Sequence, residues 1–120
     1  MTRLTFAVVV LLAAGSAQAA CIYPRAPTHT PDGQTATRDE MVAAQAAVQQ
    51  FNEDITAYNS CLDMEMRQAE TSGAYDENRL SELRAIQAKK NNAAVDEVTA
   101  VAETFNEQLR IFLAREKKSE

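Results

Sequence analysis

The sequence predicts an all-α fold: two long antiparallel helices that form a coiled-coil-like helical hairpin, preceded by a Pro-rich extended segment held by a disulfide. Three observations predict it. All three prolines lie within residues 20–36, residues 37–120 contain no proline and a single glycine, and the cysteine count is two. A chain of 120 residues allows one domain. We expect the helices at about residues 37–72 and 76–116.

Residues 1–19 have the pattern of a secretory signal peptide. Arg3 precedes an unbroken apolar run at residues 6–14, and Ala17 and Ala19 supply small residues before a cleavage site between Ala19 and Ala20. Nine apolar residues are too few for a membrane span, which needs about twenty. We therefore expect a periplasmic or secreted protein with no membrane span.

Cys21 follows the cleavage site closely, as the lipidated cysteine of a bacterial lipoprotein does. Gln18 stands where a lipobox has an apolar residue, and this departure disfavours a lipid anchor at Cys21. In an oxidising compartment an even cysteine count favours a disulfide, and Cys21 with Cys61 is the one pairing within the chain. An intermolecular disulfide and free thiols stay open as alternatives.

The reach of the chain permits this pairing. Cys61 would lie about 36 Å along a helix that begins near Thr37, whereas residues 21–36 can extend about 50 Å. The prolines prevent a regular helix in the Pro-rich segment, residues 20–36. Pro31, Asp32 and Gly33 predict a turn in which glycine takes the conformationally permissive position.

The first helix has a start signal, an apolar stripe and a stop signal. Thr37 and Glu40 match a capping box, and Gly73 follows the expected end. The stripe has alternating spacings of three and four residues, as an amphipathic helix requires. Its members are Met41, Ala44, Val48, Phe51, Ile55, Tyr58 and Leu62.

The second helix is expected to begin after Asp76, a good N-cap residue. Polar residues at 87–92 interrupt its apolar stripe; we favour a continuous helix over a kink or a change of register. A fold about Gly73 places Leu62 near Arg84 and Met41 near Phe105. Ile22 and Tyr23 are then expected to cover the polar stretch.

The end of the second helix runs past the start of the first. Its apolar residues Leu109, Ile111, Phe112 and Leu113 form our candidate partner surface, because two helices alone give a thin core. The alternative is that these residues pack against Pro31 and its neighbours. A protein partner or self-association is the expected use of such a surface.

The composition excludes several activities. A net charge of −5 provides no basic surface for nucleic acid. No catalytic motif, phosphate loop or metal-ligand pattern occurs, and the many carboxylates are typical of solvated helix faces. We predict no enzyme, no catalytic residue, no metal ligand and no cofactor.

One group of proteins shares a pattern with the first half of the chain. The pattern comprises Cys21, Pro24, Pro31, Asp32, Gly33, Ala36, Thr37, Glu40, Met41, Val48, Phe51, Tyr58, Cys61 and Leu62. Over about residues 21–62 the chain resembles an uncharacterised family of small exported (periplasmic) helical proteins of proteobacteria. This resemblance implies export and a helical start, and it implies no activity.

The sequence thus favours a non-catalytic exported helical protein that acts in protein–protein interaction or self-association in the periplasm. A periplasmic chaperone or inhibitor-like binding module is one alternative. A small-molecule or metal binder is the other.

Overall fold

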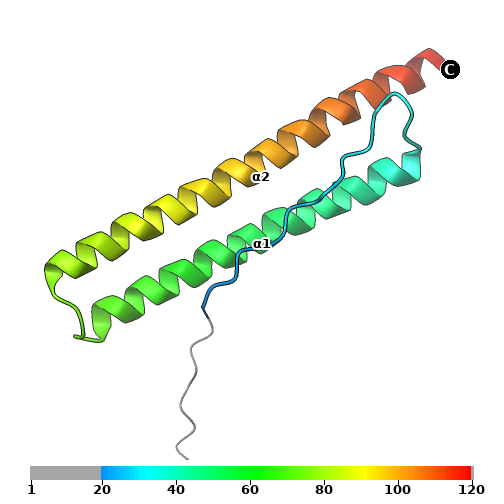
Figure 1. Ribbon diagram of the computed structural model, residues 1–120. Helices are drawn as coiled ribbons and strands as arrows, with labels where there is room; N and C mark the ends of the chain where they lie inside the picture. Colours follow the sequence, from blue (N-terminus) through cyan, green and yellow to red (C-terminus); the bar gives the residue numbers. More distant parts are fainter. Residues whose placement is uncertain (1–19, 120) are drawn as a thin grey trace, which may run out of the picture.

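A computed structural model describes residues 20–119, so the expected signal peptide and residue 120 lie outside the described residues. Helix α1 spans Arg38–Thr71 and helix α2 spans Glu77–Ser119. The two helices lie antiparallel, joined by a short turn (Figure 1), and residues 20–119 contain no strand. The prediction of an all-α helical hairpin is confirmed, with α2 continuing three residues beyond the expected end at 116.

Both ends of α1 follow the local sequence signals. The backbone N–H of Glu40 donates to Thr37 Oγ1 at 3.3 Å, and the backbone N–H of Thr37 donates to Glu40 Oε2 at 2.7 Å. The hydrogen bonds that the Glu40 carboxylate accepts, first from the Thr37 backbone and then from the Thr37 hydroxyl at 2.9 Å, lower the pKa of Glu40. At the other end Gly73 adopts a φ of +67°, a conformation that glycine reaches without steric cost.

Helix α2 begins at its predicted cap and runs without interruption. The backbone N–H of Arg79 donates to Asp76 Oδ1 at 2.8 Å. The polar stretch at 87–92 stays helical, so no kink is needed. Its residue Gln87 donates from its side-chain amide to Asp63 of α1, which gives this polar position a partner across the hairpin.

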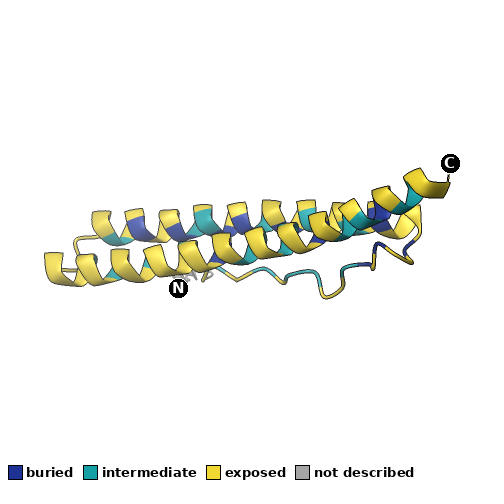
Figure 2. Ribbon diagram, turned by 90° about the horizontal axis from the view of Figure 1, so that it is seen from above, coloured by how far each residue is buried: buried dark blue, intermediate teal, exposed yellow. Residues whose placement is uncertain are grey.

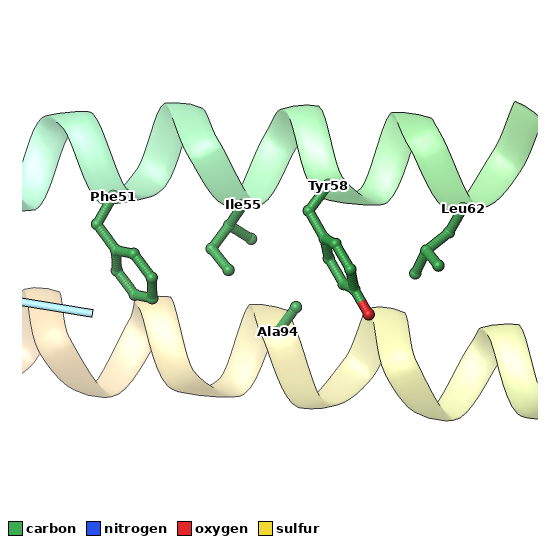
Figure 3. Close-up of a cluster of buried hydrophobic side chains, with 5 residues drawn as sticks. All are labelled: Phe51, Ile55, Tyr58, Leu62 and Ala94. Carbon is green, nitrogen blue, oxygen red and sulfur yellow. The ribbon is translucent and has the colours of Figure 1, made fainter. Parts of the chain in front are cut away.

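The core is a single row of side chains between the helices, divided into two clusters. Figure 2 shows the buried residues along the inner sides of the helices, and Figure 3 shows α1 side chains pointing at α2. The first cluster consists of Phe51, Ile55, Tyr58, Leu62 and Ala94. The second consists of Ala36, Met41, Phe105 and Phe112. Because each helix buries one stripe only, most of its surface stays exposed.

The pairing of the helices agrees with the expectation at the end distant from the turn. Met41 and Phe105 share a cluster there, as expected. Near the turn, the side chain of Arg84 extends to Glu70, with Arg84 Nε 3.0 Å from Glu70 Oε1.

The Pro-rich segment runs back along one side of the hairpin and has no regular helix or strand (Figure 1). The Sγ atoms of Cys21 and Cys61 lie at bonding distance, with Cα atoms 5.8 Å apart, and neither thiol is free. The predicted disulfide is therefore confirmed. Tyr23 packs edge-on against Tyr58, with ring centroids 5.1 Å apart. The expectation for Ile22 is wrong: its side chain is 85% exposed.

The turn predicted at Pro31, Asp32 and Gly33 is present, but its glycine has a different role. The backbone N–H of Ala36 donates to the Asp32 carbonyl at 2.7 Å. Among the described residues the one positive φ belongs to Gly73, so Gly33 does not need glycine's backbone freedom. A Cβ at Gly33 would lie 2.1 Å from the Gln108 carbonyl oxygen. Glycine is required here because two backbones touch.

Candidate functional site

The predicted partner surface at the end of α2 is largely covered by the Pro-rich segment. Phe112 is buried, Leu109 packs on its cluster, and Ile111 is half-buried beside Gly33. Leu113 alone of the four is exposed, at 56%. The expectation of an unpartnered apolar end is therefore wrong for Phe112. The structure adopts the alternative, in which these residues pack against Pro31 and its neighbours.

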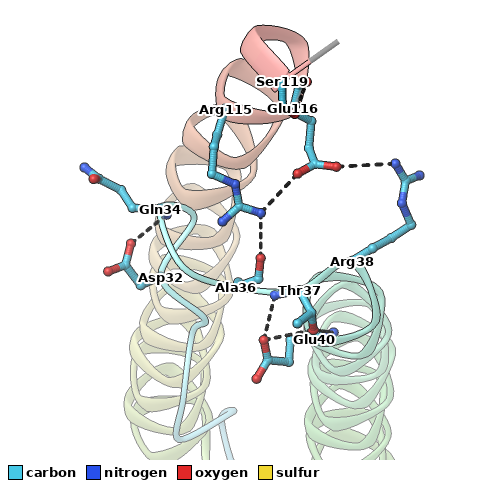
Figure 4. A network of polar contacts seen from close by, with 9 residues as sticks. All are labelled: Asp32, Gln34, Ala36, Thr37, Arg38, Glu40, Arg115, Glu116 and Ser119. Atoms are coloured by element: carbon cyan, nitrogen blue, oxygen red, sulfur yellow. Dashed lines mark hydrogen bonds and ion pairs between the residues drawn. The ribbon is translucent and has the colours of Figure 1, made fainter.

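Polar contacts hold this covered end in place (Figure 4). Arg115 Nη2 donates to the Ala36 carbonyl at 2.7 Å, and its guanidinium carbon lies 4.9 Å from the centre of the Phe112 ring. Glu116 Oε2 lies 3.8 Å from Arg38 Nη2, and Glu116 Oε1 lies 3.2 Å from Arg115 Nη2. The carbonyl bond joins α2 to the residue before the α1 cap, and the cation–π contact within α2 holds the Arg115 side chain against Phe112.

An open apolar groove lies at the other end of the hairpin, between Cys21 and the turn. We call it the turn-end groove; its volume is about 110 Å³. Its apolar lining comes from both helices: Leu62, Met66 and Ala69 of α1 with Leu83 and Ile86 of α2. Ile86 is 45% exposed. Among residues 20–36, which make up the Pro-rich segment, none lines the groove.

One acid and one base flank the apolar lining. Glu65 of α1 and Lys90 of α2 both line the groove. Glu65 Oε1 also accepts a hydrogen bond of 3.2 Å from the backbone N–H of Cys21. The same carboxylate thus marks the boundary between the covered and the uncovered parts of this face.

Polar contacts join the helices beside the groove. On α1, Glu65 is rotated about 60° from Leu62 in one direction and Asp63 about 100° in the other, so they belong to different faces. Gln87, which itself lines the groove, donates to Asp63, and Arg84 donates to Glu77 and Glu70. The bonds to Glu77 and Glu70 raise the pKa of Arg84.

The phenol of Tyr23 is a weaker acid in the folded protein than a free tyrosine side chain. Desolvation and a hydrogen bond that its hydroxyl donates to Glu97 of α2 raise the pKa of Tyr23 to about 12. The phenol joins the Pro-rich segment to α2 while the disulfide joins it to α1. Its role is structural, because the neutral hydroxyl is needed to bind the Glu97 carboxylate.

Cys21, Cys61 and Glu65 place their ligand atoms within 4.8 Å of one another. Two thiolates and a carboxylate are a donor set that soft divalent metals accept. In the oxidised protein the two sulfurs are bonded to each other. This cluster is available to a metal only after reduction.

Sequence reasoning missed the turn-end groove. The signal was present in the shared apolar character of Leu62, Met66, Leu83 and Ile86, but their exposure depends on where the Pro-rich segment ends. Neither described helix has an apolar stretch long enough to cross a lipid bilayer. Comparison of the chain with protein-family models, curated proteins and solved structures finds no match.

Proposed function

We propose that this chain is a non-catalytic exported protein that acts by protein–protein contact in the periplasm, with the turn-end groove as its contact surface. The disulfide supports an oxidising compartment, because such bonds persist there and are rare in the cytosol. The partner surface expected at the end of α2 is replaced by the groove, since Phe112 is buried.

The single observation that carries the proposal is the exposed side chain of Ile86, which lies beside the half-buried Leu83 in the groove. Contiguous apolar surface that is rimmed by charged residues marks interaction sites in soluble proteins. Leu83 and Ile86 of α2 supply this surface, and Glu65 and Lys90 supply the rim. A periplasmic chaperone or inhibitor-like module would use the same groove, so the identity of the bound protein separates these functions.

A photocrosslinking amino acid at position 86 tests the proposal in the cells that export the protein. Val95 is the matched control, since it is 49% exposed, compared with 45% for Ile86, and does not line the groove. We expect a crosslinked protein adduct from position 86 and none from position 95. Equal yields from the two positions, or no adduct from position 86, would refute the proposed surface.

A metal-binding role is a second candidate, favoured by the Cys21, Cys61 and Glu65 cluster. Calorimetric titration with Zn²⁺ tests it on the oxidised and the reduced protein. We expect binding by the reduced form that is lost in a Cys61→Ser variant. Absence of heat from the reduced protein would remove this candidate.

A further inference from the structure

We propose that Glu65 is the binding site for the α-amino group that signal-peptide cleavage creates at Ala20, so that processing of the chain completes the attachment of its Pro-rich segment. The inference rests on the export that the proposed function includes, and it does not depend on the turn-end groove. Its support is the position of Glu65 beside Ala20 and Cys21, the first described residues of the chain.

The Glu65 carboxylate already holds the backbone at the start of the Pro-rich segment. Its Oε1 atom accepts a hydrogen bond of 3.2 Å from the backbone N–H of Cys21. An ionised carboxylate has about four lone-pair sites, so a single hydrogen bond leaves most of its accepting capacity available. The Glu65 side chain is exposed, and no fold element covers it.

The nitrogen of Ala20 lies within reach of the same carboxylate. One residue spans at most about 3.6 Å of backbone, so Ala20 N lies at most about 6.8 Å from Glu65 Oε1. Ala20 is exposed and belongs to no helix or strand. Rotation about its own backbone bonds can therefore bring a terminal amine onto the carboxylate without moving Cys21.

Cleavage changes what this nitrogen offers. In the uncleaved chain it is a neutral amide with one N–H. After cleavage between Ala19 and Ala20 it is an ammonium group with three N–H donors, and it is mostly protonated at neutral pH. Hydrogen bonds in which both groups are charged are stronger than neutral ones, so Glu65 should hold the processed chain more tightly than its precursor.

The disulfide selects between two kinds of processing. A lipidated cysteine carries its lipid on sulfur, and the sulfur of Cys21 is bonded to Cys61 instead. Cleavage one residue earlier, before Ala20, leaves Cys21 free to form this disulfide. The same cleavage places the new amine beside Glu65, so the disulfide and the amine site are compatible.

The amine would join two existing attachments on one face of α1. Cys61 and Glu65 are four residues apart and therefore neighbours on the helix surface. A carboxylate oxygen of Glu65 lies within 4.8 Å of the sulfur atoms of both Cys21 and Cys61. The processed chain thus meets α1 through a sulfur, a backbone N–H and an ammonium group, whereas the precursor has only the first two.

The reactivity of the amine in the exported protein measures this contact. Sequencing from the amino end and intact mass should show a chain that begins at Ala20. An N-hydroxysuccinimide ester at neutral pH should acylate this amine about threefold faster in Glu65→Gln than in the original protein. The reason is that only the unprotonated amine reacts, and the carboxylate holds it protonated. Acylation of Lys117 and Lys118, at the far end of α2, provides the internal reference.

Glu53→Gln is the matched control. It makes the same substitution at an exposed glutamate of α1 that lies about 18 Å along the helix from Glu65, beyond the screening length of about 8 Å. We expect unchanged reactivity of the Ala20 amine in this variant. A nuclear Overhauser effect between the Ala20 methyl group and the Glu65 methylene protons is expected in the original protein and requires no variant to fold.

The outcomes separate this inference from the proposed contact surface. A chain that begins at another residue, equal reactivity in Glu65→Gln and the original protein, or absence of the Overhauser effect would each overturn the amine site. Absence of a crosslinked adduct at position 86 would refute the groove and leave the amine site in place. Recovery of the protein only from the cytoplasm, with residues 1–19 attached, would overturn both.

Discussion

Substitution of Gly33 by alanine tests whether the turn before α1 is held by backbone contact with α2. A Cβ at this position would lie 2.1 Å from the Gln108 carbonyl oxygen and 2.8 Å from the Phe112 backbone nitrogen. Neither atom can move without distorting α2, so the turn must withdraw by about 1.3 Å or more to reach ordinary contact distance. The hydrogen bond of 2.9 Å that Gly33 N donates to Gln108 Oε1 then breaks.

Overpacking and the lost hydrogen bond together predict that Gly33→Ala lowers the free energy of unfolding by about 2–4 kcal/mol. Urea denaturation followed by circular dichroism measures this change. Amide hydrogen exchange should also accelerate near Gln108 and Phe112, because the covering turn is displaced.

Gly73→Ala is the matched control. A Cβ at Gly73 meets nothing within 4 Å, and the φ of +67° is its only obstacle. That strain costs about 1–2 kcal/mol and should leave exchange near Gln108 unchanged. A Gly33→Ala protein within about 0.5 kcal/mol of the original, the usual scatter of surface substitutions, would refute the close-approach argument.

Three further predictions concern the Pro-rich segment and the start of α1. Replacing Cys21 and Cys61 by serine should lower the free energy of unfolding by about 4 kcal/mol, since the bond closes a loop with a sequence separation of 40; an unchanged urea midpoint would contradict this. Thr37→Ala should cost about 1 kcal/mol in the same assay through loss of the helix cap, whereas Thr56→Ala, within α1, should cost less. Tyr23 should titrate near pH 12 in an ultraviolet absorbance titration, and Tyr23→Phe should remove that transition. Because the pKa of Tyr23 is raised by folding, its contribution to stability is present below pH 10 and is lost as the pH rises towards 12, so alkaline destabilisation should be weaker in Tyr23→Phe.

The features that sequence reasoning predicted are those set by short-range chemistry. The α1 cap depends on Thr37 and Glu40, which are three residues apart, and the α1 stop depends on Gly73. The apolar stripe of α1 follows from helical periodicity alone. The disulfide was predictable because two cysteines allow only one pairing within the chain.

The features that were missed depend on contacts between distant parts of the chain. Gly33 has the same turn signature whether glycine serves a positive φ or a close approach, and only the position of Gln108 distinguishes the two. The burial of Phe112 depends on Ala36, which is far from it in sequence. The contact of Arg84 with Glu70 depends on the path of the turn between the helices. The turn-end groove is lined by residues of both helices, so it also depends on contacts between distant parts of the chain and could not be predicted from the sequence.

The sequence separations of the observed contacts imply an order of assembly. Contacts near the turn join residues 14 and 24 positions apart, from Arg84 to Glu70 and from Gln87 to Asp63. Contacts of the Pro-rich segment span up to 79 positions, as between Arg115 and Ala36. Short loops close faster than long ones. The two helices should therefore pair from the turn outwards before the Pro-rich segment docks onto them. Cys21 and Cys61 would then be oxidised late in folding, after the paired helices have brought the two thiols together.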